Sequence, residues 1–245
     1  MPSVDPKTVR RRNRSNSVLT MAIIWTPPAD FRGWLEHVFN RPVTRPEWFW
    51  ETTAEADWEP AQDDFLAYIT QAFERSEIAF RGFSNAQIAQ GLRFLISPSC
   101  SDGMFALKDD NIPWLKRQGV VRAIRTLFRD CFAKRCSSKL SHLDEKNLDP
   151  LNGVCYIWWD VFPIYGAPQN TEQKDLDHEI LAVMQSTLEL NHVACQESAL
   201  HGLGHWSHYY QDRVEKIIDQ FLTHNEKLRP ELRQYALQAS AGRVQ

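Results

Sequence analysis

The segment Cys195-Gln-Glu-Ser-Ala-Leu-His-Gly-Leu-Gly-His205 decides the fold, because its pattern recurs 37 residues later as Leu232-Arg-Gln-Tyr-Ala-Leu-Gln-Ala-Ser-Ala-Gly242. In this alignment Ala199 corresponds to Ala236, and Leu200 corresponds to Leu237. An amphipathic segment lies between the two copies. Such repeats are typical of stacked helix pairs, in which each unit buries its apolar face against the next. The repeat therefore predicts an all-α protein with a surface that binds another molecule.

Hydrophobic residues recur at helical spacing on both sides of this segment. From residue 172 onward the spacing predicts one helix that ends near Leu188, a second over 195–206, a third over 214–222 and a fourth that begins at Pro230. The connections between these helices are short, so we expect each helix to pack antiparallel to its neighbours.

The preceding part of the chain carries further helix signals. Ser84-Asn-Ala-Gln87 is a capping-box pattern that opens a helix, and Pro113 suits the first turn of a helix that runs to about Arg135. The apolar stretch 154–163 is expected to be helical, because an isolated strand among helices would leave its backbone groups unpaired. The remaining expectations are helices that begin near Asp30 and Pro60, and loops over 97–112 and 136–152.

The unit from about Val193 to Leu222, together with the segment 229–242, resembles HEAT-type helical repeats. Small alanines at matched positions, an arginine just after the start of the later helix (Arg233) and the Ala-Leu pair carry this resemblance, which covers about a quarter of the chain. It implies HEAT-like helix pairs over 172–245 and a concave face that binds another macromolecule, and it transfers no catalytic residue. Only one unit and the first helix of a second are evident, so a general helical bundle is the alternative.

Charge is distributed unevenly along the chain. The formal net charge is −3, but residues 1–20 carry five basic side chains against Asp5, which leaves −7 for the rest. We expect a disordered basic tail over 1–20 and a single helical domain over 21–245, with translation starting at Met1 or at Met21. Because the domain is acidic, nucleic-acid binding is not expected of it.

The cysteines and the lack of a long apolar run indicate the compartment. The chain has five cysteines and no Cys-x-x-Cys pair, which favours reduced thiols in a cytoplasmic protein over a disulfide framework. No apolar run approaches the roughly 18 residues needed to span a bilayer. A cytoplasmic protein without a membrane partner is therefore expected.

His201, His205 and His208 form the densest group of potential metal ligands in the sequence. On a helical wheel all three lie about 180–240° from Ala199, so we expect them on the face opposite the core. A pair of histidines spaced i, i+4 can bind zinc. Gly202 occupies the position where the zinc-protease motif requires glutamate.

Other polar groups admit both a functional and a structural interpretation. Asp177 or Glu179 can complete a zinc site with the histidines. Asp160, within an aromatic run, is either a catalytic acid or a residue on the outer side of a half-buried helix, and the second interpretation is favoured. Arginines 122, 125 and 129 lie in line and can bind an acidic partner, although a solvated face is the simpler interpretation.

Two functional hypotheses follow from these patterns. The favoured one is a non-enzymatic protein, such as an inhibitor or immunity-type protein, that binds another protein without a cofactor. Its expected contact residues are His201, His205, His208, Tyr209 and Arg233. The alternative is a metal-dependent hydrolase or hydroxylase that uses the three histidines.

Overall fold

The computed structural model describes residues 30–50 and 60–244, and all regular secondary structure within them is helical. The predicted all-α class is thereby confirmed, whereas the expected basic tail (1–20) and Met21 lie outside the described residues. The helices are α1 (Phe31–Phe39), η1 (Trp48–Trp50), α2 (Gln62–Glu74), α3 (Ser76–Ala79), α4 (Asn85–Ile96), η2 (Gly103–Lys108), α5 (Trp114–Leu127), η3 (Phe128–Phe132), α6 (Ala133–Arg135), α7 (Pro150–Tyr156), α8 (Trp158–Val161), α9 (Lys174–Leu188), α10 (Val193–His224) and α11 (Pro230–Ser240).

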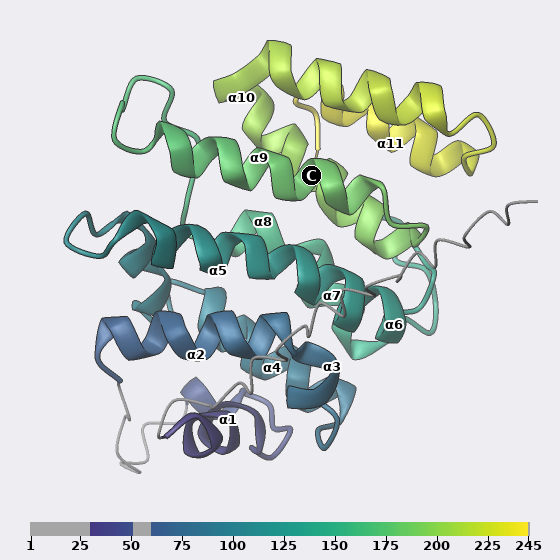
Figure 1. The fold of residues 1–245 in the computed structure, drawn as a ribbon. Coiled ribbons are helices and arrows are strands. Elements are labelled where there is room, and N and C mark those ends of the chain that lie inside the picture. The colour runs from purple at the N-terminus through teal and green to yellow at the C-terminus, as the bar shows by residue number, and fades with distance from the viewer. Residues whose placement is uncertain (1–29, 51–59, 245) are drawn as a thin grey trace, which may run out of the picture.

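The longer helices form layers that follow the order of the chain. Figure 1 shows α1 at one end, α2, α5 and α9 in succession above it, and α10 with α11 at the other end. The contacts agree with this view, because α2 packs on α5, α5 on α9, α9 on α10 and α10 on α11. The resemblance to HEAT repeats and the antiparallel pairing of the helices stay predictions.

Several predicted helix starts are confirmed at the level of single hydrogen bonds. The Ser84 hydroxyl accepts from the Gln87 backbone N–H, and the Gln87 side chain in turn accepts from the Ser84 backbone N–H, which completes the capping box of α4. Pro113 immediately precedes α5, and helical structure continues through η3, a π-helical turn, and α6 to Arg135. Pro230 occupies the first turn of α11.

The expected loop 97–112 differs from the structure, because it contains the short helix η2. The two helices expected over 195–206 and 214–222 share the label α10, but non-helical dihedral angles at Tyr210 (φ −134°, ψ 50°) separate them, as predicted. The Tyr210 hydroxyl donates to Asp177 on α9 at 2.8 Å, so a side-chain contact ties the kink to the neighbouring helix.

The apolar stretch 154–163 is helical, as predicted, but it forms two short helices, α7 and α8, that meet at Ile157. Trp158 and Trp159 of α8 are buried, and the Trp159 ring stacks on Phe128 at 6.0 Å between centroids. Gly202 allows α10 to approach this pair, because a Cβ at Gly202 would lie 2.6 Å from Cγ of Trp159. Glycine at this position therefore permits the close approach of α8 and α10.

The two copies of the repeat are not buried equally. Ala199 and Ala236 are both fully buried, but Leu200 is buried while Leu237 is 57% exposed. Helix α10 contacts α7, α8, α9 and α11, whereas α11 packs mainly against α10. The Ala-Leu pair is thus a core pair in the first copy only.

Among the described residues, no helix has both the length and the apolar character that crossing a bilayer requires.

Candidate metal centre

The face of α10 that carries the histidines is partly covered by other helices. His201 is only 3% exposed, so the prediction that all three imidazoles project away from the core is wrong. A helical wheel assumes one buried side, but here His201 contacts α7 and α11, and His205 contacts α8. The histidines therefore face neighbouring helices as well as solvent.

Glu197, His201 and His205 lie one helical turn apart along this face, and each contacts a residue from a different segment. Glu197 contacts the loop before α7, His201 contacts α11 and His205 contacts α8. We call these three residues and their partners the polar ladder of α10. The ladder connects a fully buried carboxylate at one end to solvent at the other.

The first level of the ladder is a buried carboxylate with three donors. Glu197 accepts hydrogen bonds from the backbone N–H groups of Ser141 and His142, both at 2.9 Å, and lies 2.6 Å from the His142 ring Nδ1. These bonds replace the water that the carboxylate loses on burial. They also fix the His142 ring, which stacks on Tyr235 of α11 with centroids 4.1 Å apart.

The second level joins His201 to two tyrosines. Nδ1 of His201 lies 2.7 Å from the Tyr235 hydroxyl, and that hydroxyl lies 3.3 Å from the hydroxyl of Tyr156 on α7. Burial, together with the neighbouring His205, lowers the pKa of His201 to about 4. His201 is therefore neutral at neutral pH, which is the form in which histidine binds metals. Burial also raises the pKa of Tyr235 and keeps its hydroxyl protonated.

The third level brings three potential metal ligands together. Nε2 of His205 lies 3.2 Å from Nε2 of His201 and 3.6 Å from Oδ1 of Asp160, and the three ligand atoms all lie within 4.8 Å of one another. Ligand atoms about 2.0–2.1 Å from a tetrahedral zinc ion are about 3.3 Å apart. Two of the three separations, from His205 to His201 and from His205 to Asp160, are thus close to those around a coordinated ion.

This end of the ladder is open to solvent. The side chains of Asp160 and His205 are 53% and 37% exposed, whereas His201 forms the buried base of the group. An ion held by three protein ligands keeps a coordination position for water or substrate. The exposure of Asp160 agrees with the interpretation that it lies on the outer side of a half-buried helix.

The other ligand candidates do not join this group. His208 is exposed, and its ring lies near Gly242. Asp177 accepts hydrogen bonds from Ala167 N–H at 2.7 Å and from the Tyr210 hydroxyl at 2.8 Å. Glu179 accepts two hydrogen bonds from Arg122. Both carboxylates therefore serve structural contacts.

The remaining predicted contact residues lie in different surroundings. Tyr209 is 45% exposed, one turn beyond His205 on α10. Arg233 is partly buried and donates to the carbonyl groups of Asn225 and Glu226, at 3.0 and 3.3 Å. Arg233 therefore supports the connection between α10 and α11.

The arginine row on α5 and η3 is largely engaged within the protein. Arg122 pairs with Glu179 of α9, and Arg129 pairs with its neighbour Asp130. These ion pairs favour the interpretation of the row as a solvated face over a binding site for an acidic partner.

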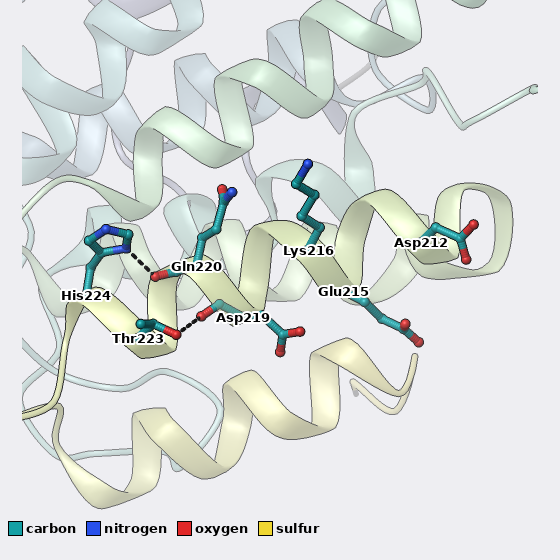
Figure 2. Close-up of a pocket in the computed structure, with 7 residues that line it drawn as sticks. All are labelled: Asp212, Glu215, Lys216, Asp219, Gln220, Thr223 and His224. Carbon is teal, nitrogen blue, oxygen red and sulfur yellow. Dashed lines mark hydrogen bonds between the residues drawn. The ribbon is translucent and has the colours of Figure 1, made fainter.

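A hollow lies along the C-terminal half of α10, away from the ladder (Figure 2). It is lined by Asp212, Glu215, Lys216, Asp219, Gln220, Thr223 and His224. Figure 2 shows these side chains on one helix, and the hydrogen bonds drawn there end on backbone carbonyls of the same helix. No group of three potential metal ligands is found here among the described residues, so the hollow carries no chemistry comparable to that of the ladder.

The sequence contains a signal for some residues of the ladder and none for the others. Glu197, His201 and His205 share an i, i+4, i+8 spacing, a signal that could have placed the glutamate on the histidine face. Asp160 and Tyr235 lie 41 residues before and 34 residues after His201, and no local pattern pairs such distant residues.

Comparison of the chain with protein-family models, with curated proteins and with solved structures found no match.

Proposed function

We propose that the protein binds a divalent transition metal through Asp160, His201 and His205 and acts as a metal-dependent hydrolase. The convergence of these three ligand atoms at the solvent-exposed end of a buried polar network supports the proposal most directly. Two imidazoles and a carboxylate are the donor set of several catalytic zinc sites, in which a fourth position holds water. Zinc lowers the pKa of that water to about 7 and so supplies hydroxide at neutral pH.

Two imidazoles and one carboxylate hold zinc in hydrolases and Fe²⁺ in oxygenases. The identity of the bound metal therefore separates a hydrolase from a hydroxylase.

Metal titration of untagged, chelator-treated protein tests the proposal. We expect one Zn²⁺ per chain by calorimetry, and a loss of affinity of more than about 100-fold in Asp160→Asn and His205→Ala, since even residues behind the ligands typically contribute 10–100-fold. His208→Ala is the matched control, because His208 lies on the same helix but outside the group. Weak, non-stoichiometric binding, or equal losses in His208→Ala and Asp160→Asn, would refute the proposal.

Protein binding is a second candidate, supported by the exposure of two large side chains, Tyr209 on α10 and Leu237 on α11. A partner that contacts either side chain should be lost from co-purification with Tyr209→Ala or with Leu237→Ala and retained with Asp160→Asn. A partner lost with none of these variants would contradict this use of the surface.

A further inference from the structure

Tyr235 contacts His201 on the side away from the other two ligands. Its hydroxyl lies 2.7 Å from Nδ1, whereas Nε2 of the same ring lies 3.2 Å from Nε2 of His205. An imidazole that binds a metal through Nε2 carries its proton on Nδ1 and needs an acceptor there. The Tyr235 hydroxyl oxygen is an acceptor within hydrogen-bond distance of Nδ1.

Tyr235 is held at its ring and at its hydroxyl. His142, fixed by Glu197, stacks on the ring with an angle of 15° between the planes. The hydroxyl of Tyr156 lies 3.3 Å from that of Tyr235 and can accept a hydrogen bond from it. The Tyr156 ring also lies against His201, with centroids 4.5 Å apart.

We propose that Tyr235 is a positioning residue that holds His201 in the Nδ1–H tautomer and so directs the lone pair of Nε2 to the metal. This inference rests on the proposed metal site. In the metal-bound protein, His201 Nδ1–H donates to the Tyr235 oxygen, and the Tyr235 hydroxyl donates to Tyr156. Without the hydroxyl, a buried N–H would have no acceptor, and such a group is costly.

The hydroxyl can also donate to Nδ1 when no metal is bound, since it is both a donor and an acceptor. His201 then carries its proton on Nε2, and this N–H donates a hydrogen bond to Nε2 of His205. Metal binding at Nε2 would therefore reverse the direction of the hydrogen bond between His201 and Tyr235. Tyr235→Phe keeps the aromatic ring and removes the hydroxyl, which is the group that can donate or accept this hydrogen bond.

Calorimetric Zn²⁺ titration of the full chain tests the inference, with Tyr235→Phe as the variant and Tyr209→Phe, an exposed tyrosine outside the ladder, as the matched control. We expect Tyr235→Phe to bind Zn²⁺ about 10–100-fold more weakly and Tyr209→Phe to bind as the unaltered protein does. Long-range ¹H–¹⁵N spectra of the zinc-loaded unaltered protein should show His201 protonated at Nδ1. This second measurement does not depend on the folding of any variant.

The outcomes separate the inference from the proposed function. If the unaltered protein binds Zn²⁺ and Tyr235→Phe binds it equally well, the positioning role is overturned and the metal site stands. A zinc-loaded His201 that is protonated at Nε2 would overturn the role in the same way. If the unaltered protein does not bind Zn²⁺, both proposals fail together.

Discussion

Replacing Gly202 with alanine is expected to destabilise the protein, although alanine is the better helix former. The new Cβ would lie 2.6–2.7 Å from three atoms of Trp159, whereas ordinary contact begins at 3.4 Å. Trp159 or the helix must therefore move by about 0.7 Å, and overpacking of this kind costs about 1–3 kcal/mol. Trp159 is buried and stacked on Phe128, so we take the upper part of this range. Alanine regains about 1 kcal/mol of helix propensity, which leaves a net loss of about 1–2 kcal/mol.

Thermal unfolding followed by near-ultraviolet circular dichroism, which reports on the buried tryptophans, measures this loss. For a domain of this size the expected decrease in Tm is about 2–8 °C. Gly204→Ala is the matched control: its Cβ would meet the side chain of Val244, which lies after the last helix and can shift. We expect Gly204→Ala to be neutral or up to about 1 kcal/mol stabilising. A Gly202→Ala protein at least as stable as the control would refute the packing argument.

The same substitution, Gly202→Ala, is also expected to affect the candidate metal site. Asp160 directly follows Trp159, so displacing Trp159 changes the distance between Asp160 and His205. We therefore expect Gly202→Ala to weaken Zn²⁺ binding and Gly204→Ala to leave it unchanged. Equal Zn²⁺ affinity in the two variants would show that α8 adjusts without moving the carboxylate.

Further substitutions test separate parts of the structure. Ser84→Ala removes the capping box of α4 and should cost about 1 kcal/mol in urea unfolding, against no change for the exposed Lys216→Ala. Glu197→Gln replaces a buried acceptor of three donors and should cost about 2–3 kcal/mol in the same assay. A loss below about 0.5 kcal/mol, the level of an ordinary surface substitution, would contradict its anchoring role. Arg122→Ala breaks an exposed pair with Glu179 and should cost less than about 1 kcal/mol, decreasing further with added salt.

The helical class and most helix positions could be predicted from the sequence because they depend on local chemistry. The capping box at Ser84 and the prolines at 113 and 230 act on hydrogen bonds within one or two turns. Periodic apolar residues then specify which side of each helix is buried. The break between the helices expected over 195–206 and 214–222 was also predicted, and it falls at Tyr210. The hydrogen bond from Tyr210 to Asp177 could not be predicted, because Asp177 lies on another helix.

Only part of the candidate site could be predicted from the sequence, because its other residues come from other helices. The sequence by itself determined that His201 and His205 lie one turn apart on α10, since helix geometry requires it. Only the tertiary structure decided that His201 is buried, that His208 stays outside the group, and that Asp160 and Tyr235 complete it. These outcomes depend on how α8 and α11 pack against α10, and packing joins residues whose separation along the chain leaves no local pattern.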